Sequence, residues 1–222
     1  MTATPSNHAR ESAPARETHP NFVVVGVGIL SLVLMGVAFF GPWWVSSTES
    51  PSSFRFEYGI SGLCGHYGPE ASFCLTYSGF TGVGNVSALE RLFFNTATFV
   101  LVSSIATSMG LVIGLIPRAQ NRLLWISVGL LTVGGVGLLT AAAYVMVALP
   151  SAIRSLGAAF VMGFAGSSST GASVIRYGPA TSWWACLLGG IVLFVPLASR
   201  LYTRRIQESH PVFADQTDDE QP

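Results

Sequence analysis

Residues 43 to 91, WWVSSTESPSSFRFEYGISGLCGHYGPEASFCLTYSGFTGVGNVSALER, form a mostly polar stretch between two long apolar runs. A polar segment that leaves one membrane span and returns by another must face water, because its polar groups find no partners in hydrocarbon. The stretch carries two of the three cysteines of the chain, Cys64 and Cys74, ten positions apart. We therefore expect it to form a folded unit at the membrane surface, held in place by the apolar runs.

The composition is that of a membrane protein. Half of the 222 residues are hydrophobic and 10% are charged, whereas soluble domains have roughly a quarter charged residues. Eleven basic residues, all of them Arg, balance eleven acidic residues. No excess charge points to nucleic acid as a partner, and we expect none. The apolar composition predicts the lipid bilayer as the partner.

Four apolar runs are long enough to cross a bilayer, which takes about 20 helical residues. They are Phe22–Val45, Leu92–Ile116, Leu123–Leu149 and Thr181–Ser199. None of them contains Asp, Glu, Arg or His, whereas a membrane enzyme or a proton-coupled transporter is expected to place ionisable groups there. We therefore predict a protein that is not an enzyme and has no cofactor.

A further apolar segment, Ala152–Gly166, is too short for a fifth crossing and contains Arg154. We expect it to extend the third helix or to lie along the membrane interface. The Ser-rich Ser167–Gly171 is predicted to be a flexible loop tip, and Ser173–Tyr177 is predicted to add a strand.

The first 21 residues are rich in Ser, Thr, Pro, Ala and His, which predicts a disordered tail. The apolar run that follows exceeds the roughly 7 to 15 residues of a signal-peptide core, and no small-residue cleavage site follows it, so we expect a retained first span. Gly26, Gly28 and Gly36 along this run offer close approach to a neighbouring helix. Trp43 and Trp44 lie at its end, where they are interpreted either as interfacial anchors alone or as part of a family signature.

Two segments of the polar stretch alternate apolar and polar residues, as half-buried strands do. These are Phe54–Tyr58 and, with a similar character, Phe73–Tyr77. The Gly-rich segment Gly65–Pro69 between them is predicted to form a turn or loop. The sequence therefore predicts a small antiparallel sheet.

Cys64 and Cys74 admit two interpretations. On an oxidising side of the membrane, a disulfide between them would close a short loop and stabilise the sheet by roughly 2 to 3 kcal/mol. The alternative is a metal site with His66, the nearby imidazole. Cys186 lies a few residues inside the fourth run and is expected to be a free thiol.

Arginines flank the apolar runs on one side, which predicts the orientation in the membrane. They are Arg10 and Arg16 before the first run, Arg118 and Arg122 between the second and third, and Arg200, Arg204 and Arg205 after the fourth. We predict cytoplasmic termini, a membrane domain over residues 22–202, a tail over residues 203–222, and outer loops at residues 46–91 and 150–180. Asn85, which begins an Asn-Val-Ser sequon in the first outer loop, would then be a glycosylation site in a eukaryotic source, or the sequon is a chance occurrence.

The order of these features resembles the claudin superfamily, which includes peripheral myelin protein relatives and calcium-channel gamma subunits. The residues that match its signature are Trp43, Gly62, Leu63, Cys64, Cys74 and Arg91. The resemblance implies an all-α membrane protein with a small β addition, that is, a left-handed four-transmembrane-helix bundle capped by a small extracellular antiparallel sheet. It also implies that the two cysteines of the first loop are bonded to each other.

The sequence departs from the claudin pattern both within its signature and in its last residues. In claudins a Trp follows Gly-Leu and the first cysteine comes later, whereas here Cys64 follows Leu63 directly. The last residues, Asp-Asp-Glu-Gln-Pro, lack the hydrophobic terminal side chain that a PDZ groove accepts, so no PDZ partner is expected.

Two functions fit this sequence. The first is a claudin-like structural, adhesive or barrier-forming protein of the plasma membrane that self-associates through its outer loops. The second is an accessory subunit that binds another membrane protein, such as a channel, a transporter or an envelope complex. The first loop carries four glutamates, Glu49, Glu57, Glu70 and Glu90, against Arg55 and Arg91. This net charge of about −2 is too small to predict a charge-selective pore.

Overall fold

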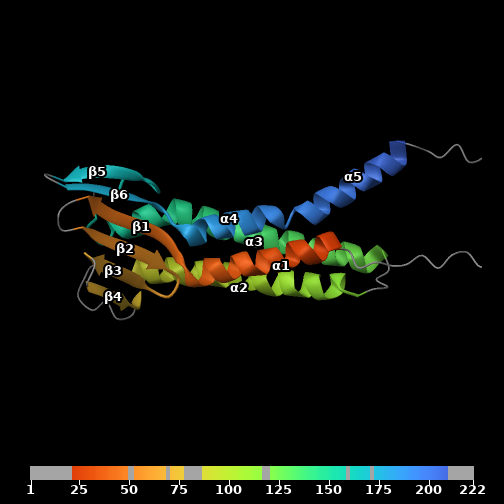
Figure 1. Ribbon diagram of the computed structural model, residues 1–222, viewed down its shortest axis with the longest axis horizontal. Helices are drawn as coiled ribbons and strands as arrows, with labels where there is room; N and C mark the ends of the chain where they lie inside the picture. Colours follow the sequence, from red (N-terminus) through yellow and green to blue (C-terminus); the bar gives the residue numbers. More distant parts are fainter. Residues whose placement is uncertain are drawn as a thin grey trace, which may run out of the picture.

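The computed structural model describes residues 22–49, 53–68, 71–77, 87–116, 121–158, 161–170 and 173–209. Long helices lie side by side and carry a β-sheet at one end (Figure 1). The helices are α1 (Phe22–Phe40), α2 (Ser87–Gly114), α3 (Asn121–Arg154), α4 (Thr181–Val192) and α5 (Val195–Ser209). Among the described residues, four helical segments, α1, α2, α3 and the stretch Thr181–Arg205 that joins α4 to most of α5, are long and apolar enough to cross a membrane. The predicted tail at residues 1 to 21 and Asn85 lie outside the described residues.

The four spans pack as a ring in which α1 contacts α2 and α4, and α3 contacts the same two helices. Small residues let these helices approach closely. A side chain on Gly110 would meet the Ser127 carbonyl at 3.0 Å, and the Ser127 hydroxyl donates a hydrogen bond to the Gly110 carbonyl at 2.7 Å. Of the glycines predicted to serve this purpose in α1, Gly28 faces Leu111 of α2, whereas Gly26 and Gly36 have open space beside them.

The first helix is shorter than predicted. It ends at Phe40, whereas the predicted span ends at Val45. Pro42 has no backbone N–H, so it cannot continue the helical hydrogen bonding. A side chain on Gly41 would collide with the Ser182 hydroxyl and would lie 3.1 Å from the Val37 carbonyl. The chain therefore leaves the bundle at this point as a strand.

In the part of the chain that the structure describes, six antiparallel strands form one sheet in the order β4-β3-β2-β1-β6-β5. The strands are β1 (Pro42–Glu49), β2 (Phe54–Gly59), β3 (Leu63–Tyr67), β4 (Ala71–Leu75), β5 (Gly166–Thr170) and β6 (Ser173–Pro179). Two strands connect directly to helices. The strand β1 follows α1, and the strand β6 precedes α4. The sheet thus joins both predicted outer loops into one unit.

The predicted strands at Phe54–Tyr58 and Ser173–Tyr177 are confirmed. One prediction is wrong in part and another is wrong. The segment Gly65–Pro69 was expected to be a turn or loop, but Gly65, His66 and Tyr67 belong to β3, and the turn begins at Gly68, which has a positive φ of 59°. The segment Ser167–Gly171 was expected to be a loop tip, but Ser167 to Thr170 belong to β5, because β6 supplies a partner for their backbone groups.

The bounds of one predicted strand and of three predicted spans also differ from the structure. The strand predicted at Phe73–Tyr77 lies two residues earlier, at β4, and α2 begins at Ser87, five residues before its predicted start. The third helix continues through Pro150 to Arg154, and β5 follows at Gly166, so the segment after it does not form a fifth span. The fourth span breaks at Leu193 and Phe194, just before Pro196, and α5 continues to Ser209 at an angle to the bundle (Figure 1).

Candidate functional site

The sheet has two faces of different character, because successive side chains of a strand point to opposite sides. The inner face carries Trp44, Tyr58 and Tyr177, which are buried. Their rings pack across three adjacent strands, with centroids 5.2 Å apart for Trp44 and Tyr58 and 5.6 Å apart for Trp44 and Tyr177. The outer face carries Glu57, His66 and the two cysteines, among other polar side chains.

Trp43 and Trp44 fix the sheet on the bundle. The Trp43 indole donates to the Ala38 carbonyl at 2.6 Å, and the Trp44 indole donates to the Phe164 carbonyl at 2.7 Å. Both rings are essentially inaccessible, with exposed fractions of 0% and 1%. The interpretation of this pair as interfacial anchors alone is therefore wrong, because neither ring is free to lie among lipid headgroups.

The Gly62-Leu63-Cys64 step passes very close to β4. A side chain on Gly62 would collide with the Leu75 carbonyl, so only glycine fits here. Cys64 and Cys74 face each other across β3 and β4 and are bonded, with their sulfur atoms 2.07 Å apart. The alternative of a metal site at these cysteines is wrong, since each thiol is consumed by the other, and Cys186 is free and buried, as predicted.

Tyr77 is a site residue that sequence reasoning missed. Its hydroxyl donates to the Gly59 carbonyl at 2.7 Å and lies 3.1 Å from the Gly62 carbonyl, so it holds the β2–β3 turn. Its ring stacks on Phe93 of α2 with centroids 5.3 Å apart. Burial raises the pKa of Tyr77 above its ordinary value, and the neighbouring Tyr58 adds to the shift. The only sequence signal was an aromatic residue shortly after the second cysteine.

The charged groups of the outer face lie near the disulfide. Arg55 forms an ion pair with Glu57 at 2.8 Å, and the imidazole of His66 lies 4.0 Å from the same carboxylate. Both Arg55 and His66 are substantially exposed. Exposed pairs of this kind contribute little to stability, so they characterise the surface more than they support the fold. Arg91, the last signature residue, is exposed in the second turn of α2.

The β4 edge of the sheet is open among the described residues. In the β2–β3 pair, Gly59 N–H donates to the Gly62 carbonyl and Gly68 N–H to the Ser53 carbonyl. Hydrogen-bonded and non-hydrogen-bonded residue pairs alternate along an antiparallel ladder. The backbone N–H and C=O of Cys64 therefore face β2, and Cys64 and Cys74, although joined by their disulfide, exchange no backbone hydrogen bonds. The amides of Ser72 and Cys74 therefore point away from β3, out of the sheet.

The same reasoning applies to the β5 edge. Ala180 N–H donates to the Trp43 carbonyl at 3.0 Å, which fixes the alternation through β1, β6 and β5. The amides of Ser167 and Ser169 consequently point away from β6. All four residues with outward amides, Ser72, Cys74, Ser167 and Ser169, are exposed.

These features describe the exposed surface of a sheet that is fixed on the helices. Within the described residues, no three of His, Cys, Asp and Glu gather closely enough to hold a metal ion. The sheet offers outward backbone groups on two edges, a rigid frame tied to the spans, and a polar outer face. Comparison with models of known protein families and with curated protein sequences gives no match.

Proposed function

We propose that this protein is a non-enzymatic, claudin-like structural protein whose copies join edge to edge through their sheets in one membrane. The single observation that carries the proposal is the chemistry of the two sheet edges. The strands β4 (ASFCL) and β5 (GSSST) contain no charged residue and no proline. Natural sheets normally protect their edges with such residues, because unprotected edges pair with other chains.

The direction of the strands supports pairing of β4 with β5 of a neighbouring copy. Each of the six strands is antiparallel to its neighbours, so β4 and β5 run in opposite directions. Copies that stand in the same orientation in one membrane would therefore bring β4 against β5 in antiparallel register. Pairing of β4 with β4 in that arrangement would be parallel. The unlike edges favour a head-to-tail contact, which builds rows or rings.

The substitution Ser72→Pro tests the proposal. It removes an N–H that points out of the sheet and leaves the β3–β4 hydrogen bonds in place, as proline tolerates an edge position of this kind. Losing one interstrand hydrogen bond, together with the bulk of the ring, should weaken association between copies roughly fivefold or more. Ser167→Pro should act in the same way from the other edge.

The measurement is energy transfer between labelled copies reconstituted in vesicles, over a range of protein-to-lipid ratios. Ser72→Ala is the matched control, because it keeps the outward amide and should associate like the unchanged protein. Disulfide mapping checks that each variant has kept its sheet. Unchanged association in both proline variants would refute edge pairing. A foreign membrane protein that co-purifies in stoichiometric amount, without contact between copies, would instead favour the accessory-subunit function.

A further inference from the structure

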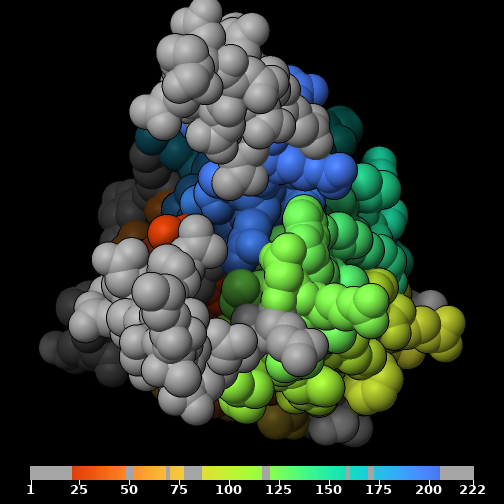
Figure 2. Space-filling view, turned by 90° about the vertical axis from the view of Figure 1, so that its right-hand side faces the viewer, coloured from red at the N-terminus to blue at the C-terminus, as the bar shows by residue number. Residues whose placement is uncertain are grey.

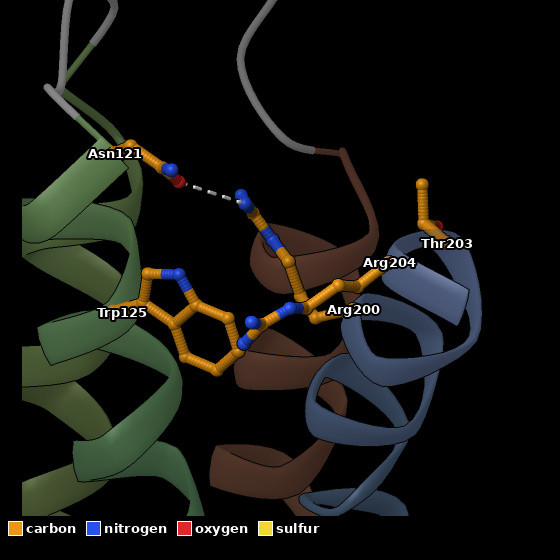
Figure 3. A pocket seen from close by; sticks show the side chains of 5 residues that line it. All are labelled: Asn121, Trp125, Arg200, Thr203 and Arg204. Carbon is orange, nitrogen blue, oxygen red and sulfur yellow. Dashed lines mark hydrogen bonds between the residues drawn. The ribbon is translucent and has the colours of Figure 1, made fainter. Parts of the chain in front are cut away.

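The end of the bundle opposite the sheet contains a hollow between α3 and α5. Figure 2 looks onto this end, where the green start of α3 lies beside the blue α5. The hollow has a volume of about 400 Å³ and is lined by Asn121, Trp125, Arg200, Thr203 and Arg204. Figure 3 shows the long side chains of both arginines reaching from α5 toward α3.

The lining is basic, with no acidic side chain among its five residues. Arg200 donates to the Asn121 side-chain carbonyl at 3.4 Å, and the guanidinium of Arg204 points toward the ring of Trp125 (Figure 3). The hollow also lies at the N-terminal end of α3, where the helix dipole favours anions. Guanidinium groups match the geometry of phosphate oxygens through paired N–H donors. The chemistry of the hollow is thus that of a phosphate site.

The neighbouring surface of α5 carries two exposed apolar side chains. A second hollow of about 330 Å³ shares Arg204 and is lined by Leu201, Tyr202 and Arg205. Leu201 is 49% exposed and Tyr202 is 69% exposed. Arg204 therefore stands between a polar hollow and an exposed apolar wall at the end of the fourth span. An amphiphile with an anionic head fits this arrangement better than a small soluble anion does.

We propose that the hollow between α3 and α5 binds the phosphate-bearing headgroup of an anionic phospholipid, with its acyl chains along Leu201 and Tyr202. Arg200 and Arg204 hold the phosphate, and the lipid bridges α5 to the bundle. This site does not depend on pairing of the sheets, because it lies at the other end of the molecule.

Native mass spectrometry of the detergent-solubilised protein tests this site, with phosphatidylglycerol as the probe and phosphatidylcholine as the zwitterionic comparison. One phosphatidylglycerol should bind in preference to phosphatidylcholine. Arg200→Gln and Arg204→Gln should each weaken its binding about tenfold, the usual effect of losing one hydrogen bond between charged groups. Arg122→Gln is the matched control, since Arg122 is exposed at the same end of the bundle but lines neither hollow.

Three results would overturn the proposal. Equal binding of the two lipids would remove the headgroup preference. An equal loss in Arg122→Gln would show general attraction between the basic end and anionic lipid. Inorganic phosphate that binds with the same dependence on Arg200 and Arg204, and displaces phosphatidylglycerol at equal concentration, would identify a site for a free anion.

Discussion

Tyr77 links the sheet to the bundle through a single side chain, with its hydroxyl on the β2–β3 turn and its ring on Phe93. Its pKa and that of Tyr58 are both raised by burial, that of Tyr58 to about 12 despite a hydrogen bond with Ser46. Each phenol is therefore neutral in the folded sheet. In the unfolded chain a phenol ionises near pH 10, so folding binds these two protons more tightly.

The sign of the resulting pH dependence follows from linkage. The contribution of both tyrosines to stability is fully present below about pH 10, and it falls as the pH rises through 12. The chain has no lysine, and arginine stays charged in this range, so phenols dominate the titration there. We expect hydrogen exchange of the β2–β3 turn to accelerate above pH 10, beyond the general base-catalysed increase measured on exposed amides.

The variant Tyr77→Phe separates the hydroxyl from the ring. It should lose about 1 kcal/mol at neutral pH, because one hydrogen bond to the turn is removed while the stacked ring is kept. It should also show a smaller additional loss between pH 10 and 12. Hydrogen-exchange mass spectrometry of the turn measures both quantities. A variant with the same exchange as the unchanged protein at every pH would exclude this role for Tyr77.

At the scale of elements, the contact between α2 and α3 depends on glycine. A side chain on Gly134 would lie 2.5 Å from the Thr107 hydroxyl and 3.2 Å from the Ser103 carbonyl. Because the carbonyl belongs to the backbone of α2, Gly134→Ala should push the two helices apart and cost about 1 to 3 kcal/mol, as overpacking does. Unfolding in mixed micelles of increasing dodecyl sulfate, followed by circular dichroism, measures this loss.

Gly129→Ala provides the control on the same helix. Nothing lies within 4 Å of a side chain placed at Gly129. Alanine should leave stability unchanged or raise it slightly, because alanine has a higher helix propensity than glycine. If both substitutions had the same effect, close approach of α2 and α3 would not explain the glycine at position 134.

The elements that the sequence predicted correctly are those with a local signal. Hydropathy identified the four spans, and the alternation in Phe54–Tyr58 identified β2. The strand β1 was missed because Trp43, Trp44 and Val45 continue the apolar run of α1, and β5 was missed because Ser167 to Ser169 have no hydrophobic pattern. The strand β1 depends on β6, about 130 residues away in sequence, and a local pattern does not contain that information. The strand β5 pairs with the adjacent β6, so its backbone pairing and not its side chains defines it.

The candidate sites were predictable only in part. The matching signature residues indicated the disulfide and the place of the outer sheet. Tyr77 was not singled out, and Arg200 and Arg204 were considered only as markers of orientation. The outward amides of the two edges and the hollow at α5 depend on strand register and on helix packing, which become visible only in three dimensions.

At the scale of the whole molecule, the remaining prediction is the orientation in the membrane. The bundle end opposite the sheet carries Arg122, Arg200, Arg204 and Arg205 among the described residues, close to the ends of the spans. Positive residues near span ends favour the cytoplasmic side. The disulfide between Cys64 and Cys74 belongs to the sheet end and favours an oxidising compartment. Both arguments predict a sheet outside the cell and termini in the cytoplasm.

Labelling of single introduced cysteines with a membrane-impermeant maleimide tests this orientation in intact cells. Ser53→Cys, exposed beside β2, should react without lysis, whereas Leu115→Cys, 49% exposed at the other end of the bundle, should react only after lysis. Cys186 is fully buried and provides no background signal. The reverse labelling pattern would place the sheet in the cytoplasm. There a reducing environment would open the disulfide and cost about 2 to 3 kcal/mol of sheet stability, so the orientation also decides whether the edge-forming strand β4 is held in place.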